Sequence, residues 1–175
     1  MSKTILITGG ARSGKSVIAE TKALSLAPRA VYIATAEVRD AEMAARVADH
    51  RARRGLEWID HAEAFDLTGA LRKTDGQGPR LVDCLTLWLT NLLMPAQGEA
   101  APAEAAAATL ASTITAHTGP LILVSNEIGL GVIPMGRETR AFVDALGRLN
   151  QQVAAACDRV TLMAAGLPLT LKGKA

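Results

Sequence analysis

Residues 4–16 read TILITGGARSGKS, an apolar run followed by a glycine-rich segment that ends in lysine and serine. The last eight residues, 9–16, fit the pattern G-x-x-x-x-G-K-[ST] at every fixed position. The flanks also fit, because a strand-forming run precedes the pattern and a helix-forming run follows it. A glycine-rich turn can match such a pattern by chance, but with both flanks correct the stretch predicts a strand, a phosphate-binding loop and a helix.

This loop predicts a nucleotide site. Its glycines let backbone N–H groups point inward, and the N-terminus of the following helix adds a partial positive charge. Lys15 is expected to reach the β and γ phosphates, and Ser16 to bind Mg²⁺. The nucleotide-binding residues predicted here are Gly9, Gly10, Ala11, Arg12, Ser13, Gly14, Lys15 and Ser16.

A second magnesium ligand is expected at the end of another buried strand. Asp83 closes the run RLVD at 80–83 and is the best candidate. An aspartate in this position also suits the N-cap of the helix predicted next. The two interpretations are compatible.

The rest of the chain predicts one α/β domain spanning residues 1–175, with a mainly parallel central sheet flanked by helices. Apolar runs predict strands at 4–8, 30–35, 80–83, 121–126 and 159–166, and a last run at 167–172 that can pair antiparallel with its neighbour. Helices are predicted at 14–26, 39–54, 66–73, 84–93, 102–116 and 137–156.

Composition narrows the class of partner. A net charge of +2 and 3% aromatic residues argue against a nucleic-acid platform. Cys84 and Cys157 lie far apart without a Cys/His cluster, which favours neither a disulfide framework nor a zinc site. No run approaches the ~18 apolar residues of a membrane span, and the N-terminal run is too short for a signal peptide. We therefore expect a cytoplasmic protein.

A histidine lies among arginines at residues 41–54. Helical spacing places Arg46, His50 and Arg54 along one face, with Arg51 and Arg53 beside them. An imidazole near guanidinium groups is held in its neutral, nucleophilic form, and arginines suit the phosphates that it would attack. The residues alone nevertheless favour a solvated basic helix face carrying an ordinary histidine.

The segment VSNEIGLGVIP, at 124–134, begins as a buried strand and breaks into a loop with two glycines. In an open parallel sheet, ligands bind beyond the carboxyl ends of the strands, where Asn126 and Glu127 are expected. Gly129 and Gly131 suggest a close backbone approach or a mobile segment. A plain transition from strand to loop is the alternative.

These segments together resemble one family, the bifunctional adenosylcobinamide kinase and adenosylcobinamide-phosphate guanylyltransferase of cobalamin biosynthesis. The matching segments, in family order, are TGGARSGKS at 8–16, YIATAE at 32–37, EMAARVADHRARR at 42–54, DCLTLWLTNLL at 83–93, VSNEIGLGVIP at 124–134 and FVDALGRLNQQVAAACDRV at 142–160. Many proteins share the phosphate loop, whereas its combination with the histidine–arginine helix and the VSNEIG segment is specific.

The resemblance implies two reactions. ATP or GTP phosphorylates the hydroxyl of adenosylcobinamide, and GTP then donates GMP to that phosphate through a guanylylated histidine, which matches His50 here. It implies catalytic roles for His50 and Lys15, and metal ligation by Ser16 and Asp83. Beyond the phosphate loop and Asp83, the nucleotide-site residues implied are Ala34, Thr35, Ala36, Arg51, Ala52, Arg53 and Arg54.

The resemblance also implies a recombinase-like P-loop NTPase fold and a homo-oligomer, commonly a trimer. One position departs from the family, whose members usually carry a glutamate four residues after the tryptophan matching Trp58. That position is Ala62 here, and the nearest carboxylate, Glu63, is the substitute we expect. Two other functions stay open: a kinase of another small alcohol without guanylyl transfer, and a non-catalytic nucleotide-binding module.

Overall fold

The computed structural model describes residues 3–52, 54–94 and 100–173, apart from the side chains of residues 46 and 100–102. Seven strands form one sheet in the order β3-β2-β4-β5-β1-β6-β7. All neighbours pair in parallel except β6 and β7, which pair antiparallel at one edge. The predicted parallel sheet with an antiparallel C-terminal edge is therefore confirmed. The strands are β1 (Thr4–Gly9), β2 (Ala30–Ala34), β3 (Trp58–Ala62), β4 (Arg80–Asp83), β5 (Leu121–Val124), β6 (Arg159–Ala164) and β7 (Leu167–Lys172).

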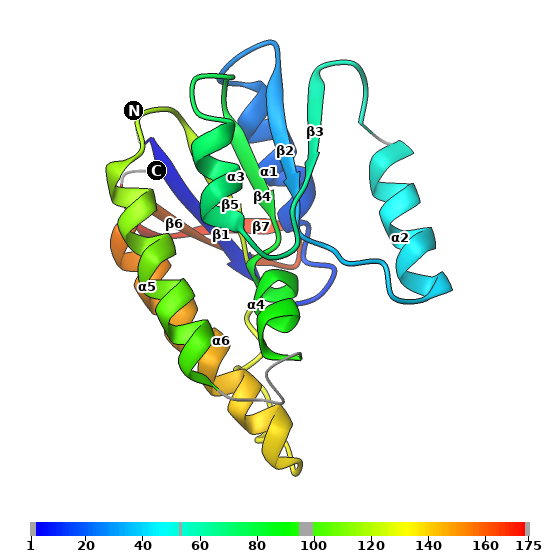
Figure 1. Ribbon diagram of the computed structural model, residues 1–175, viewed down its shortest axis with the longest axis vertical. Coiled ribbons are helices and arrows are strands. Elements are labelled where there is room, and N and C mark those ends of the chain that lie inside the picture. The colour runs from blue at the N-terminus through cyan, green and yellow to red at the C-terminus, as the bar shows by residue number, and fades with distance from the viewer. Residues whose placement is uncertain (1–2, 53, 95–99, 174–175) are drawn as a thin grey trace.

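Helices cover both faces of this sheet (Figure 1). The helix α1 packs on one face, and α3, α4, α5 and α6 pack on the other. Every predicted helix is found, with its ends shifted by two residues or fewer. The helices are α1 (Lys15–Leu24), α2 (Ala41–Ala52), α3 (Leu67–Lys73), α4 (Leu85–Leu93), α5 (Ala100–Ala116) and α6 (Arg137–Ala156).

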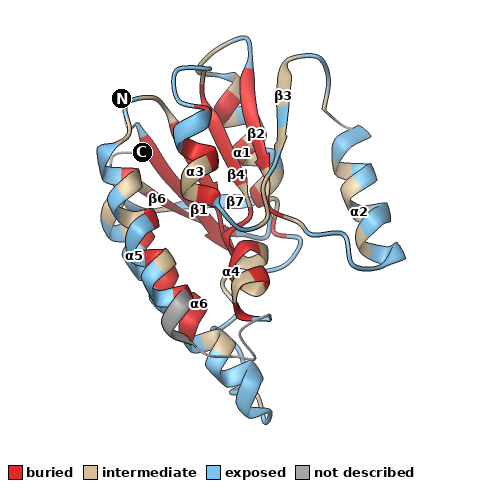
Figure 2. Ribbon diagram, in the orientation of Figure 1, coloured by how far each residue is buried: buried red, intermediate tan, exposed pale blue. Residues whose placement is uncertain are grey.

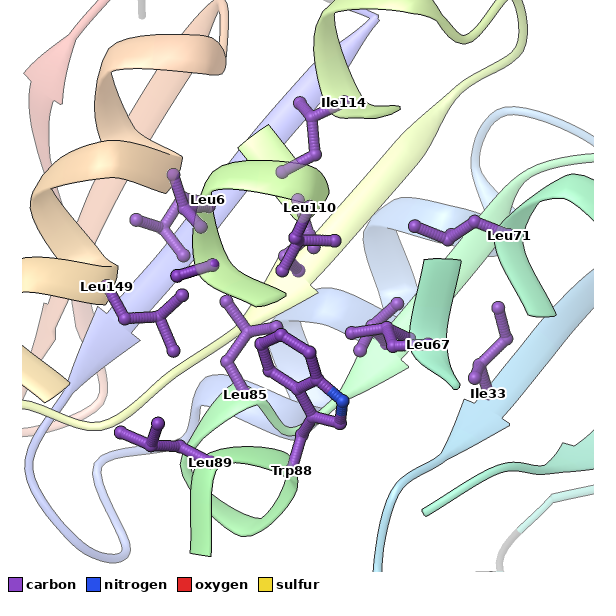
Figure 3. Close-up of a cluster of buried hydrophobic side chains, with 14 of the residues drawn as sticks. Leu6, Ile33, Leu67, Leu71, Leu85, Trp88, Leu89, Leu110, Ile114 and Leu149 are labelled. Atoms are coloured by element: carbon purple, nitrogen blue, oxygen red, sulfur yellow. The ribbon is translucent and has the colours of Figure 1, made fainter. Parts of the chain in front are cut away.

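Side chains along the buried strands point alternately to the two faces of the sheet and so contribute to two apolar cores. In β1, Ile5 and Ile7 point toward α1, whereas Leu6 points toward the four helices on the other face. The larger core gathers around Trp88 and Leu110, which come from α4 and α5 (Figure 3). Strands covered on both faces in this way need no polar alternation, which explains the nearly continuous apolar runs of the sequence.

The strand β3 was missed by the sequence analysis. It pairs only with β2 and forms the other edge of the sheet. Its sequence, WIDHA, places Asp60 and His61 in the strand, and none of its five residues is buried. A half-buried edge strand with polar residues at its centre lacks the continuous apolar run from which the other strands were predicted.

The helix α2 differs from all the others, because it stands away from the body beyond β3 (Figure 1). Its described residues are exposed or half-buried, whereas α1 and α3–α6 each carry buried residues (Figure 2). None of the helices in the described part of the chain is long and apolar enough to cross a membrane.

Candidate active site

The phosphate loop connects β1 to α1 at the carboxyl end of the sheet. Its first residue, Gly9, packs so closely on β6 that a Cβ atom there would lie 2.3 Å from the carbonyl oxygen of Met163. Its last glycine, Gly14, caps α1 with a left-handed backbone (φ 92°) that favours glycine. The N–H groups in the first turn of a helix lack intrahelical partners, so the start of α1 offers donors to an anion.

Lys15 is folded back over the loop. Its ammonium donates to the carbonyl oxygen of Gly10 at 2.6 Å and lies 3.5 Å from the hydroxyl of Ser13. Burial lowers the pKa of Lys15, and the nearby Asp83 carboxylate opposes that shift. A buried cation above inward-pointing N–H groups makes this end of the site suited to phosphate.

Asp83 faces the loop from the end of β4. Its Oδ2 accepts a hydrogen bond of 2.9 Å from the hydroxyl of Tyr32. Burial, followed by the charge of Asp83, raises the pKa of Tyr32, so the phenol stays protonated and donates to the carboxylate. The adjacent thiol of Cys84 also has its pKa raised by burial, to about 12, and is therefore no nucleophile at neutral pH.

His50 comes from the exposed helix α2. Arg54, just beyond that helix, stacks its guanidinium 3.7 Å above the centre of the Tyr32 ring and donates to the carbonyl oxygen of His50 at 3.2 Å. The same guanidinium pairs with Asp60 of β3 at 3.0 Å. Arg51 pairs with the other oxygen of Asp60, at 3.2 Å. The arginines thus bind the end of α2 to the edge of the sheet.

These groups surround one pocket of about 690 Å³. The phosphate loop and Asp83 line it from the sheet, and α2 lines it with a single helical stripe that includes His50. Of the predicted site residues, those lining the pocket are Ala11, Arg12, Ser13, Gly14, Lys15, Ser16, Ala34, Ala36, His50, Arg54 and Asp83.

Other predicted residues lie outside that lining. Thr35 is fully buried, and its hydroxyl bonds the carbonyl oxygen and amide of Cys84 at 2.7 and 2.8 Å. The carboxylate of Glu63 accepts the amides of the two residues that precede α3, Phe65 and Asp66. The remaining described residues outside the lining are Gly9, Gly10, Arg51 and Ala52, while Arg53 falls outside the described residues.

The chain beyond β5 meets the site as expected from its position in the sheet. Asn126 lines the pocket, and its amide and side chain both donate to the hydroxyl of Thr86 at 3.0 Å. Glu127 turns to the opposite side, where its carboxylate accepts from Thr8 and Asn150. A Cβ atom on Gly131 would meet no atom within 4 Å, so close backbone approach does not explain that glycine.

Sequence reasoning missed several residues of the pocket. Met43 and Val47 line it from α2, and their spacing to His50 is a helical stripe that the sequence already contained. The sequence did not indicate a site role for Tyr32, because an aromatic residue inside an apolar strand is expected to be an ordinary core residue. Only its neighbours in space, Asp83 and Arg54, distinguish it.

The residues predicted to bind Mg²⁺ fit that ion. Ser16 and Asp83 approach the pocket from two elements and offer the oxygen atoms that magnesium prefers. Asp83 already accepts one hydrogen bond, but an ionised carboxylate has about four lone-pair sites and retains capacity for a metal.

Comparison with known proteins identifies the family. The model of the family described as CobU, cobinamide kinase / cobinamide phosphate guanyltransferase, matches residues 5–171. The chain belongs to this family. It is 48% identical over 170 residues to the bifunctional adenosylcobalamin biosynthesis protein CobP of Pseudomonas aeruginosa, covering 97% of both chains. It is 38% identical to CobU of Salmonella typhimurium, covering 96% of this chain and 99% of the relative. The resemblance on which the sequence analysis relied is confirmed.

Solved structures support the fold of this CobU-family chain. The P4 protein from bacteriophage phi6 in complex with ADP superposes with a TM-score of 0.53 at 20% identity, covering 96% of this chain and 54% of that one. A Pyrococcus horikoshii protein superposes with a TM-score of 0.54 at 7% identity, covering 99% and 87%. The predicted P-loop NTPase fold is thereby confirmed.

Proposed function

We propose that the chain phosphorylates the hydroxyl of adenosylcobinamide and then transfers GMP from GTP to the new phosphate through a guanylyl-histidine at His50. The observation that carries this proposal is the shared pocket. The phosphate loop and His50 line one cavity, although they come from the core and from a helix outside it. Family membership, and relatives named as bifunctional proteins, support both reactions.

In the kinase step, the substrate hydroxyl attacks the γ-phosphorus and loses its proton to solvent, the bond from that phosphorus to the β–γ bridging oxygen breaks, and the nucleoside diphosphate leaves. Lys15 and the N–H groups at the start of α1 would hold the phosphate oxygens as charge moves onto the leaving group. Mg²⁺ held by Ser16 and Asp83 would supply further positive charge to the bound phosphates.

In the transferase step, an imidazole nitrogen of His50 attacks the α-phosphorus of GTP, and pyrophosphate leaves. An oxygen of the substrate phosphate then attacks the same phosphorus, and the nitrogen–phosphorus bond breaks. The product carries GDP linked to cobinamide, and the histidine is regenerated. The buried Cys84 thiol, un-ionised at neutral pH, is a poor competitor for this nucleophilic role.

Labelling with α-³²P-GTP tests the proposal. The wild-type protein should take up an acid-labile label and release pyrophosphate, whereas His50→Ala should take up none. His61→Ala removes a histidine of β3 that does not line the pocket, and it should label like the wild type. His50→Ala should still phosphorylate adenosylcobinamide, because the kinase step uses no histidine.

Each other result points elsewhere. Label that persists in His50→Ala overturns the assignment of the nucleophile. A wild-type protein that phosphorylates adenosylcobinamide without taking up label is a kinase alone. Tight nucleotide binding without turnover of adenosylcobinamide would indicate that the protein is a non-catalytic nucleotide-binding module. Running the kinase assay with ATP and with GTP also decides which triphosphate serves that step.

A homo-oligomer, a trimer by family resemblance, is part of the proposal, as is a cytoplasmic location. The support for assembly is the edge strand β7, whose outward face carries Leu167, Leu169 and Leu171 at 71%, 56% and 58% exposure. Three exposed leucines on one face of an edge strand are typical of a covered surface. Light scattering should give the mass of three chains, and Leu169→Asp should reduce it.

A further inference from the structure

The position of His50 depends on how α2 is held, because none of the described side chains of α2 is buried in either core. Arg54 provides an attachment at its end. The Arg54 side chain is only 6% exposed, and its three nitrogen atoms bond Asp60 of β3 and the carbonyl oxygen of His50. A buried guanidinium must be paired to be tolerated, so this attachment is specific in geometry.

The face of that guanidinium rests on Tyr32. The Tyr32 side chain belongs to β2, is 3% exposed, and lies 3.7 Å from the carbon at the centre of the guanidinium. Trp58 packs against the tyrosine ring in a T-shaped arrangement, with ring centres 5.6 Å apart and planes at 85°. The aromatic pair therefore forms a rigid platform under the cation.

The other end of Tyr32 reaches the phosphate end of the pocket. Its hydroxyl donates to Oδ2 of Asp83 at 2.9 Å. One buried side chain thus contacts both the carboxylate beside the phosphate loop and the arginine that holds the histidine helix, and all of these residues line the same pocket.

We infer that Tyr32 is a positioning residue for guanylyl transfer: its ring sets the place of Arg54, and through Arg54 that of His50, relative to the phosphates held near Asp83. This inference rests on the proposed function. A displacement of about 1 Å in a reacting group can cost about 100-fold in rate, so a helix whose described side chains are not buried in a core needs such a reference point. The γ-phosphoryl step, which His50 does not serve, depends on the platform less.

Two substitutions separate the two ends of Tyr32. Tyr32→Phe keeps the ring under Arg54 and removes the bond to Asp83, whereas Tyr32→Leu removes both. Tyr32→Leu should slow guanylylation of His50 by a factor between about 10 and about 100. The factor by which it slows the kinase step should be smaller, by about fivefold or more. Tyr32→Phe should raise the Mg²⁺ concentration that gives half-maximal kinase activity, with guanylylation less affected than in Tyr32→Leu.

Amide hydrogen exchange measures how firmly α2 is held by the contact between Arg54 and Tyr32, and it requires no activity assay. Amides of α2 should exchange about tenfold faster in Tyr32→Leu than in the wild type, and at the wild-type rate in Tyr32→Phe. Phe65→Leu, an exposed aromatic outside the pocket, is the matched control and should leave these amides unchanged. If wild-type His50 takes up no label, the proposed function fails, but hydrogen exchange still tests whether Tyr32 and Arg54 hold α2 in place.

Arg54→Gln guards against a Tyr32→Leu variant that does not fold, because it breaks the same contact from the side of α2. It should speed exchange of the α2 amides and slow guanylylation more than phosphorylation. Combined with Tyr32→Leu, it should give less than the product of the two single effects, since both changes remove the Tyr32–Arg54 contact, while Arg54→Gln also removes the bonds to Asp60 and to the carbonyl oxygen of His50. Wild-type exchange in α2, or equal slowing of the two reactions, would overturn the inference.

Discussion

The two walls of the pocket are built in different ways. The phosphate wall consists of the phosphate loop, the end of β4 and the start of α1, all fixed by a sheet that is covered on both faces. The α2 wall is a helical stripe on an exposed helix, attached through Arg54 to Tyr32 and Asp60. The phosphate wall is therefore fixed by the elements that form the cores, whereas His50, the proposed nucleophile, lies on a helix whose described residues are not buried in either core.

This difference has a functional consequence. A preorganised cradle holds charge at a fixed place, which suits the phosphates common to both reactions. In the proposed function, His50 acts on the α-phosphorus in one of the two reactions and takes no part in the other. A helix with so little support from the core therefore relies on the attachment through Arg54 to keep His50 in place for that reaction.

The largest effect is expected at Lys15. Lys15→Ala should lower both the kinase rate and the guanylylation rate by about 100-fold to 1,000-fold, as removal of one preorganised charge donor does elsewhere. The fold should remain, because the change removes a buried charge rather than an apolar contact. Steady-state kinetics and single-turnover labelling measure the two rates, and Lys22→Ala, at the far end of α1, is the control. A loss below tenfold in both would show that the phosphate wall works without its cation.

Thr35→Val should affect stability instead of catalysis. The substitution leaves the buried carbonyl and amide groups of Cys84 without their shared partner, which costs about 1–3 kcal/mol of unfolding free energy. Urea unfolding measures that loss, and Thr109→Val on the exposed face of α5 should change it by less than about 0.5 kcal/mol. A raised KM for GTP at unchanged stability would instead support the nucleotide contact predicted for Thr35.

Thr35 illustrates what the sequence could and could not predict. The contiguous segment 34–36 was assigned to the nucleotide site, but Ala34 and Ala36 line the pocket while Thr35 between them points into the protein. Side chains alternate along an extended chain, so the pattern alone contained this distinction. The buried strands and the phosphate loop were predictable because apolar runs and glycine spacing are local signals.

The α2 wall was predictable only in part. The spacing of Arg46, His50 and Arg54 indicated one helical face, but it suggested arginines directed at phosphates. In the structure Arg54 instead pairs with Asp60 and stacks on Tyr32. Asp60 lies in β3, the edge strand that the sequence did not predict because polar residues interrupt its apolar run. Contacts between β2, β3 and α2 are tertiary, and no single segment encodes them.

A smaller effect is expected at the amino end of β1, the strand that leads to the phosphate loop. Asp158 accepts backbone N–H groups of Thr4 and Lys3, and these bonds lower the pKa of its carboxylate. A lowered pKa in the folded state contributes stability above the unfolded value of about 3.9. That stability disappears as the pH falls through the folded pKa.

The substitution Asp158→Asn should therefore destabilise the protein at pH 7 by no more than about 1 kcal/mol, since the group is exposed and screened. Urea unfolding at neutral pH and near pH 3 measures the difference between wild type and variant, which should shrink in acid. A difference that is constant with pH would mean that the charge of Asp158 plays no part in holding β1 to β6.

The smallest effect on stability is expected in the α2 wall. Val47→Ala removes a half-buried side chain, which costs free energy, but alanine favours a helix over valine by up to about 0.7 kcal/mol. The two terms oppose each other, so the unfolding free energy should change by less than about 0.5 kcal/mol. The KM for GTP should rise, because Val47 lines the pocket. A loss of more than about 1 kcal/mol of unfolding free energy, measured by urea unfolding, would show instead that α2 unfolds as part of the cooperative core. The two walls of the pocket would then differ in solvent exposure but not in how firmly the rest of the fold holds them.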